Sequence, residues 1–164
     1  MALFDVLTNL PHRRYFLEHL DIVLKRASRR PISSFSVCFM DCDEFKQIND
    51  DHGHQVGDAV LKHIARAVSK LIRANDFFAR LSGDEFCLVL EETTSEKDLE
   101  VTLNKILNVI ATPFEIENKT ILVTMSIGVA VYPKAAESAD ALLKHADEAM
   151  YAAKRNTKNT YVIY

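Results

Sequence analysis

An acidic turn between two apolar runs constrains the fold of this chain most. The runs 77–81 and 86–90 predict two strands, and Gly83 at the bend between them predicts a tight β-hairpin. Taken alone, Asp84 or Glu85 at the tip is typical of a solvated turn. Side by side, the two carboxylates repel each other and bury nothing. We therefore interpret them as ligands of a hard divalent cation, in practice Mg²⁺ with a phosphate substrate.

The bulk properties exclude several classes of protein. The formal charge of the 164 residues is −3, which gives no general electrostatic reason to expect a nucleic acid partner. No apolar run approaches the ~20 residues of a membrane span, and the start lacks the basic segment of a signal peptide. The three cysteines match no zinc spacing. We expect a cytoplasmic domain without membrane contact of its own, even where the full-length protein is membrane-anchored.

Helical and strand patterns alternate along the chain. Helices are predicted over 10–27, from about 44, and over 56–72, 95–110 and 138–154; strands are predicted over 35–41, 77–81, 86–90, 114–116, 121–131 and 161–164. Two predicted hairpins, at 77–90 and at 114–131, favour an α+β (mixed α/β) fold with a central, mostly antiparallel sheet wrapped by helices. Because the sequence stops directly after its last predicted strand, we expect residues 1–164 to be a single domain from a longer protein.

A second polar segment follows the strand predicted over 35–41. Asp41 ends that strand, where a buried carboxylate costs several kcal/mol unless a partner such as a metal ion compensates it. Asp43 is predicted to cap the next helix, and capping alone could explain it. The backbone N–H groups of Glu44, Phe45 and Lys46 would then form a phosphate site at the helix N-terminus. A calcium loop of the EF-hand type is excluded, because Phe45 stands at position 5, Lys46 stands at position 6 and no glutamate closes the loop.

Five segments, in this order and at this spacing, resemble the GGDEF family of diguanylate cyclases: Asp5–Arg13, Asp41–Asp58, Arg80–Phe86, Thr124–Ala130 and Ala146–Lys154. The signature is an SGDEF variant, because Ser82 replaces the first glycine. Asn9 and Thr157 also stand where glycine is usual. Asn tolerates positive φ at position 9, whereas β-branched Thr157 does not, so we expect Asn156 in the left-handed region.

The resemblance implies a palm-like fold related to nucleotidyl cyclases and polymerases. It also implies condensation of two GTP into cyclic di-GMP and pyrophosphate across a homodimer, with Mg²⁺ (or Mn²⁺). Asp41, Asp84 and the carbonyl of Cys42 would bind the metal. Glu85 would be a further metal ligand or would help to deprotonate the attacking hydroxyl, and the sequence does not separate these roles. Because serine is small, we expect Ser82 to preserve activity.

The resemblance also assigns substrate and product contacts. Asn49 and Asp58 would recognise guanine, since a carboxylate accepts hydrogen bonds from its N1–H and N2–H₂ groups. The remaining substrate-binding set, around the phosphates and the turn, would be Lys46, Lys154, Lys158, Phe45, Glu44, Ser82 and Gly83. Arg73 and Asp76 resemble the family's inhibitory product site, an Arg-x-x-Asp five residues before the signature turn, and this fixed spacing favours that role over the alternative of a surface arginine ending a helix and an aspartate opening a strand.

A second hypothesis assigns this domain no catalysis. It would bind GTP or cyclic di-GMP and control an attached module such as an EAL phosphodiesterase. Loss of Lys46, Asp84 or Glu85 would have favoured that hypothesis, and the sequence retains all of these residues.

Overall fold

The computed structural model describes residues 2–31, 33–91 and 95–164. Its main feature is a five-stranded sheet in the order β2-β3-β1-β6-β7. The central strand β1 pairs antiparallel with β3 and β6, and β7 pairs parallel with β6. The strands are β1 (Phe35–Cys42), β2 (Phe77–Ser82), β3 (Glu85–Leu90), β6 (Met125–Tyr132) and β7 (Thr160–Ile163). The predicted mostly antiparallel α+β architecture is confirmed.

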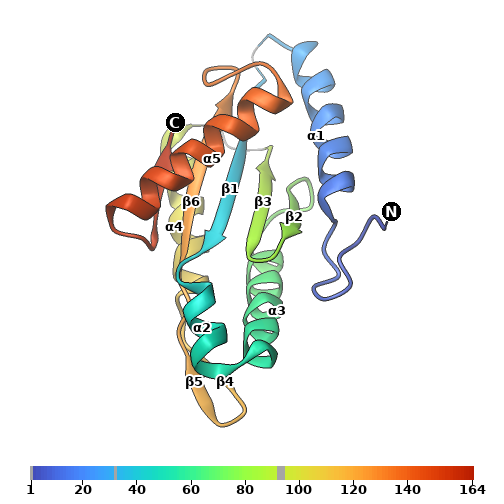
Figure 1. Cartoon of the computed structure of the whole chain (residues 1–164). Helices are drawn as coiled ribbons and strands as arrows, with labels where there is room; N and C mark the ends of the chain where they lie inside the picture. Colours follow the sequence, from blue (N-terminus) through green and yellow to red (C-terminus); the bar gives the residue numbers. More distant parts are fainter. Residues whose placement is uncertain (1, 32, 92–94) are drawn as a thin grey trace.

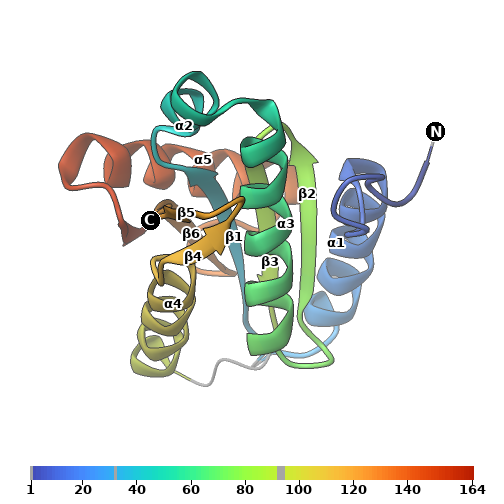
Figure 2. The same ribbon diagram turned by 90° about the horizontal axis from the view of Figure 1, so that it is seen from below.

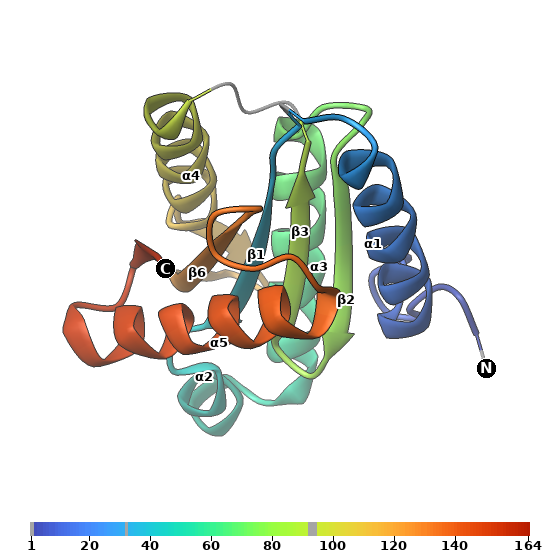
Figure 3. The same cartoon turned by 90° about the horizontal axis from the view of Figure 1, so that it is seen from above.

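Helices cover both faces of this sheet. They are α1 (Arg13–Ser28), α2 (Phe45–His52), α3 (His54–Leu71), α4 (Glu96–Ile110) and α5 (Ala139–Asn156). Helices α3 and α4 lie against one face, and α1 and α5 lie against the other (Figures 2 and 3). Helix α2 instead lies beyond the end of the sheet at which β1 finishes (Figure 1). The chain therefore leaves the core at the end of β1, at the segment where the candidate site residues are concentrated.

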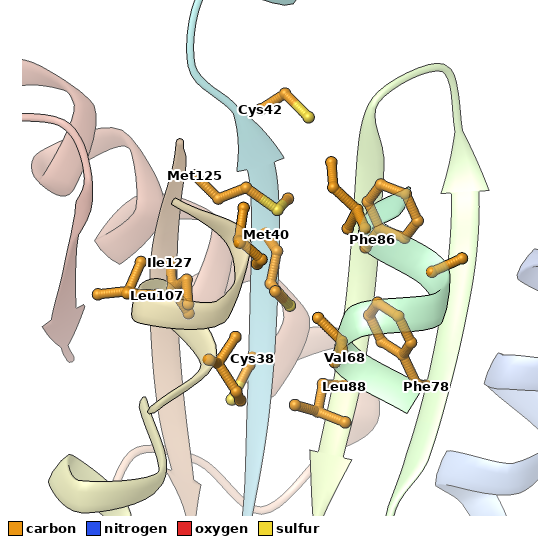
Figure 4. Packing of buried hydrophobic residues seen from close by; sticks show 14 of the residues in the cluster. Cys38, Met40, Cys42, Val68, Phe78, Phe86, Leu88, Leu107, Met125 and Ile127 are labelled. Atoms are coloured by element: carbon orange, nitrogen blue, oxygen red, sulfur yellow. The ribbon is translucent and has the colours of Figure 1, made fainter. Parts of the chain in front are cut away.

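Strand β1 is buried on both faces because two apolar clusters sandwich it. Cys38 and Met40 contribute to the cluster under α3 and α4 (Figure 4), whereas Phe35 and Val37 contribute to the cluster under α1 and α5. Burial of alternate residues on opposite sides fixes the register, since a slip of one residue would exchange the two faces. The side chain of Asp41 is thereby fixed at the end of the sheet.

Three local predictions were wrong at element boundaries. The strand predicted over 121–131 is two strands, of which β5 (Lys119–Ile121) pairs with β4 (Phe114–Ile116) and β6 belongs to the main sheet. Helix α1 begins at Arg13 instead of Leu10, because the backbone of Leu10 and Pro11 bonds to the N-terminal segment and to β2. Leu71, expected in the core, is 37% exposed.

The end of α5 also differs from expectation. Thr157 is in the right-handed region, and the positive φ angles fall on Lys158 and Asn159 rather than on Asn156. The Lys158 N–H donates to the Ala153 carbonyl, and the helix ends at Asn156, two residues later than predicted. The predicted positive φ at Asn9 is confirmed, at 60°. No helix among the described ranges is long and apolar enough to cross a membrane.

Candidate functional site

The hairpin tip and the end of β1 bring two carboxylates together. Strands β2 and β3 join through Gly83, at φ +46°, and Asp84, while the Cys42 N–H donates to the Asp84 carbonyl at 3.3 Å. Burial raises the pKa of Asp41 to about 7, and the Asp84 carboxylate acts in the same direction, as an acceptor for the proton of Asp41 and as a like charge. Two carboxylates this close share a proton unless a cation neutralises them.

Lys154, on the last turn of α5, supplies a cation at this point. Its Nζ donates to the Cys42 carbonyl at 3.0 Å and lies 3.3 Å from Asp41 Oδ1 and 3.5 Å from Asp43 Oδ1. The ammonium has three hydrogen-bond donors, which match these three oxygens. The three acceptors include two of the predicted metal-binding groups, the Asp41 carboxylate and the Cys42 carbonyl.

Asp43 does not cap α2, so that prediction was wrong. Its carboxylate is buried and accepts hydrogen bonds from Thr124 Oγ1 and Ser126 Oγ, both at 2.6 Å, and from the Asn159 N–H at 2.9 Å. Glu44 takes the N-cap position in the left-handed region, at φ 54°, without a capping hydrogen bond from its side chain. Asp43 is buried, and an unpaired buried carboxylate is costly. Its carboxylate therefore bonds to hydroxyls that are distant in the sequence and buried with it, and not to the exposed N–H groups at the start of α2.

The donor set at the end of β1 fits a magnesium ion. Asp41, Asp84 and the Cys42 carbonyl offer hard oxygen ligands, and Mg²⁺ is typically held by one or two carboxylates together with water and substrate phosphates. In the described part of the chain, no group of three or more His, Cys, Asp or Glu side chains could hold a metal by itself. Main-chain and substrate oxygens would therefore have to complete the coordination.

Glu85 is paired directly opposite Asp41 across strands β1 and β3. Its Oε2 accepts a hydrogen bond from the Ser82 hydroxyl at 3.2 Å, across the turn. Ser82 and Glu85 are also paired across the hairpin, where the register shifts by a bulge after Arg80. The serine that replaces the first family glycine thus contacts the acid that the resemblance assigns to catalysis.

The Asn49 side chain packs against Gly57 at the start of α3. A Cβ atom built on Gly57 would lie 1.8 Å from Asn49 Oδ1, so only glycine leaves room for this side chain. Asn49 Oδ1 is buried and has no hydrogen-bond partner among the described residues. Asp58 follows Gly57 directly and is exposed. An unsatisfied buried acceptor beside an exposed carboxylate is an arrangement that a ligand with N–H donors would complete.

The predicted phosphate contacts lie at the start of α2. Lys158 Nζ lies 3.3 Å from Glu44 Oε1, and Lys46 is exposed in the first turn of the helix, next to Phe45. A cavity of about 440 Å³ adjoins this end and is lined by Asp43, Glu44, Gln47, Ile48, Asp51, His52, Leu122, Thr124, Thr157, Lys158 and Asn159. Neither Asp41 nor Asp84 lines this cavity, so it lies beside Glu44 and Lys158 and not at the acidic pair.

Arg73 and Asp76 lie at the far end of β2. Asp76 Oδ2 accepts a hydrogen bond from the Arg73 N–H at 2.9 Å, and Oδ1 accepts one from the Glu91 N–H at 3.3 Å. Asp76 therefore anchors the loop that precedes β2. The six residues of β2 separate it from the acidic turn by about 20 Å of strand. A ligand at this pair would occupy a place distinct from the acidic turn.

Sequence reasoning assigned no role to a contact between Asp5 and Arg80. Arg80 Nη1 lies 3.0 Å from both Asp5 carboxylate oxygens, and its Nε donates to the Gly83 carbonyl at 2.8 Å. Both residues lie in segments that resemble family motifs, and their opposite charges were the signal from which this contact could have been predicted. The contact ties the N-terminal segment to the backbone of the acidic turn.

An antiparallel sheet with paired acids at a hairpin tip, next to the end of its central strand, defines a palm-like domain of the nucleotidyl cyclase type. The comparison with family models makes this specific. Residues 2–160 match the model described as diguanylate cyclase, GGDEF domain, and the chain belongs to this family.

Similar proteins and structures agree with this assignment. The signaling protein YkoW of Bacillus subtilis is 41% identical over 165 residues, which cover 100% of this chain and 20% of that protein. The diguanylate cyclase TpbB of Pseudomonas aeruginosa is 38% identical over 95% of this chain and 36% of its own length. The chain thus spans about a fifth to a third of these relatives.

The solved structures repeat the fold. The GGDEF domain of TpbB superposes with a TM-score of 0.94 at 37% identity, covering 98% of this chain and 93% of that structure. The GGDEF domain of DgcB from Caulobacter crescentus, solved in complex with c-di-GMP, gives a TM-score of 0.90 at 28% identity over 99% of this chain and 96% of that structure.

Proposed function

We propose that this domain is an active diguanylate cyclase that condenses two GTP molecules into cyclic di-GMP with release of pyrophosphate. The observation that carries the proposal is the acidic pair at the end of β1, where Asp84 helps to raise the pKa of Asp41 and Lys154 Nζ lies 3.3 Å from Asp41 Oδ1. A site built this way binds a divalent cation and polyphosphate. The relatives named as diguanylate cyclases support the same reaction for this chain.

The proposed site residues form three groups, which bind the metal ion, the guanine base and the phosphates. Asp41, Asp84 and the Cys42 carbonyl hold Mg²⁺ (or Mn²⁺), which neutralises charge that develops at the reacting phosphate. Asn49 and Asp58 bind guanine, and the buried, unpaired Oδ1 of Asn49 accepts from one of its N–H groups. Adenine presents the opposite pattern of donors and acceptors at these positions. The pocket therefore selects GTP over ATP.

The phosphate end lies between α2 and α5. The free N–H groups at the start of α2, with Lys46, hold the β- and γ-phosphates by charge and by the helix dipole. Lys158 adds a second cation from the end of α5, and its present partner Glu44 is an exposed carboxylate that a phosphate can replace. The triphosphate then extends from the guanine pocket towards the acidic turn.

We assign proton transfer to Glu85. Its carboxylate accepts a hydrogen bond from Ser82 and comes from the strand position opposite Asp41, so it is placed beside the proposed metal ligands to accept the proton of the attacking 3′-hydroxyl. The resulting 3′-oxygen attacks the α-phosphate of the second GTP, and pyrophosphate leaves. The Ser82 hydroxyl, which donates to Glu85 in this structure, can donate to the nucleotide instead.

Each domain holds a single nucleotide, so the reaction requires two domains with their sites face to face. A homodimer is therefore part of the proposal, as is a cytoplasmic location, where GTP and Mg²⁺ are available. The DgcB complex supports binding of the product, cyclic di-GMP, by this fold. For this chain we place the product at Arg73 and Asp76, remote from the turn.

The test measures product and binding separately. The domain, fused to a dimeric coiled coil, is incubated with GTP and Mg²⁺, and cyclic di-GMP is quantified. Glu85→Gln should abolish product formation while GTP still binds, because the change removes the proton acceptor and keeps the shape. Glu117→Gln, an exposed residue of the β4–β5 turn, serves as the control.

One observation favours a second candidate, a regulatory domain that binds GTP or cyclic di-GMP without catalysis. The hydrogen bond between Ser82 and Glu85 engages the assigned base. If that bond blocks catalysis, the dimer binds GTP without forming product, and Ser82→Gly restores activity. If the site is active, Ser82→Gly changes the rate by less than about tenfold, since the hydrogen bond that it removes is exposed to solvent and contributes about 1 kcal/mol.

A further inference from the structure

We propose that Lys154 competes with the metal ion for its oxygen ligands. In the metal-free domain the Lys154 ammonium contacts these oxygens, and metal binding releases the ammonium to the nucleotide phosphates. The inference rests on the proposed function, because it concerns the same site. It adds a competition between a side chain and the metal, which the assignment of Lys154 as a phosphate ligand does not contain.

The contacts of Lys154 support this role. Nζ lies 3.0 Å from the Cys42 carbonyl oxygen and 3.3 Å from Asp41 Oδ1, two of the oxygens assigned to the metal. A metal ion bound to these oxygens at about 2.0–2.1 Å would lie within about 5 Å of the ammonium. Repulsion between the two cations at that separation favours departure of the ammonium when the metal binds.

The Asp43 carboxylate stays in place while the metal ion replaces the Lys154 ammonium. Asp43, 3.5 Å from Nζ, has its oxygens held by Thr124, Ser126 and the Asn159 backbone. It therefore stays in place whether or not the ammonium is present. The Lys154 side chain is 23% exposed and extends from the end of α5 towards Asp43, which lines the cavity at the start of α2.

The exchange couples metal and nucleotide. Without nucleotide, the released ammonium has no strong new partner, so the metal binds against the cost of breaking its contacts. With nucleotide, the phosphates accept the ammonium, and this cost is removed. The two ligands therefore bind cooperatively, and the cooperativity passes through one side chain.

The test is a titration of the domain with Mn²⁺ alone, followed by the electron paramagnetic resonance signal of free Mn²⁺. Lys154→Met removes the competing charge and keeps the length of the side chain. It should tighten Mn²⁺ binding about tenfold or more, the size expected for hydrogen bonds to charged groups. Lys154→Gln, a neutral polar variant, should tighten it as well and covers the case in which Lys154→Met folds poorly.

The control is Lys144→Met, which removes the same charge from an exposed position on α5. It should leave the Mn²⁺ affinity within about twofold of the parent, because exposed charges interact weakly. A second titration includes a GTP analogue with a methylene group between the α- and β-phosphates. There the parent should gain Mn²⁺ affinity from the analogue, and Lys154→Met should gain much less.

An unchanged or weaker Mn²⁺ affinity of Lys154→Met, or no detectable binding by it, would overturn the inference. An equal gain in Lys144→Met would overturn it too, because net charge would then explain the effect. Since the first titration uses neither GTP nor turnover, tighter binding by Lys154→Met supports the inference even if no cyclic di-GMP is formed. Failure of this inference can thus be distinguished from failure of the proposed function.

Discussion

The contact between Asp5 and Arg80 gives a quantitative prediction for stability. Their side chains are only 11% and 14% exposed, and Arg80 Nη1 lies 3.0 Å from both carboxylate oxygens. Hydrogen bonds to charged groups contribute about 1.5–3 kcal/mol each, and Asp5→Asn keeps one acceptor oxygen. We therefore expect Asp5→Asn to lower the free energy of unfolding by about 2 kcal/mol at pH 7.

The assay is urea unfolding followed by circular dichroism, with a thermal scan alongside. For a domain of this size, 2 kcal/mol corresponds to a decrease of roughly 4–8 °C in Tm. The matched control is Asp21→Asn, because Asp21 forms an exposed ion pair with Lys25, with side chains 58% and 70% exposed. That variant should change the free energy of unfolding by less than about 0.5 kcal/mol.

The pH dependence provides a second check on the same contact. Burial opposes ionisation of Asp5, but the hydroxyl and N–H of Thr8 and the Arg80 guanidinium together lower its pKa below the usual value. A carboxyl with a lowered pKa stabilises the folded state above its unfolded pKa of about 4, and this contribution is lost as the pH falls through the folded value. The effect of Asp5→Asn should thus be complete at pH 7 and shrink below about pH 4.

A loss in Asp5→Asn no larger than that in Asp21→Asn would refute this reasoning. The same result would remove the argument that the N-terminal segment holds the acidic turn. If the loss is as large as expected, product formation should fall with it, because Arg80 also supports the Gly83 carbonyl at 2.8 Å.

Three further predictions address the base pocket, the acidic pair and the packing of α5. Gly57→Ala places a Cβ atom 1.8 Å from Asn49 Oδ1, so GTP affinity measured by calorimetry should fall at least about tenfold, as expected for a loss of 1–3 kcal/mol. Because the folded pKa of Asp41 is raised to about 7, urea unfolding of the metal-free domain should show stability that decreases from about pH 4 to pH 7, and Asp41→Asn should remove this decrease. Gly128→Ala brings a Cβ atom to 1.9 Å from the Ala146 carbonyl, so it should lower the free energy of unfolding, measured in urea, by about 3 kcal/mol or more.

The architecture was predictable because its signals are local. Each strand of the main sheet and each long helix has an apolar pattern of its own period, and the turn at Gly83 identifies the hairpin. The strand predicted over 121–131 shows the limit of such reasoning. Its apolar pattern continues through Val123, but the Thr124 carbonyl accepts from the Asp43 N–H at 2.9 Å, and the sheet begins only at Met125. No local pattern reports a partner so distant in the sequence.

The candidate site was predictable as a set of residues and not as a set of contacts. The motifs named Asp41, Asp84, Asn49 and Lys154, and the structure places the first two in contact. Asp43 misled local reasoning because its hydroxyl partners are 81 and 83 residues away in the sequence. Lys154 reaches the Cys42 carbonyl across 112 residues. Capping rules consider only residues that are neighbours in the sequence, so they do not predict a hydrogen bond to a residue that is distant in the sequence.

The stoichiometry of the reaction tests the central claim most directly. The dimerised domain is given GTP and Mg²⁺, and cyclic di-GMP and pyrophosphate are quantified in the same sample. A diguanylate cyclase releases two pyrophosphates for each cyclic di-GMP, because each of the two phosphodiester bonds forms with loss of one. We expect this ratio, and we expect both products to disappear together in Glu85→Gln. A dimer that binds GTP tightly and forms neither product, with Ser82→Gly equally inactive, would contradict the account.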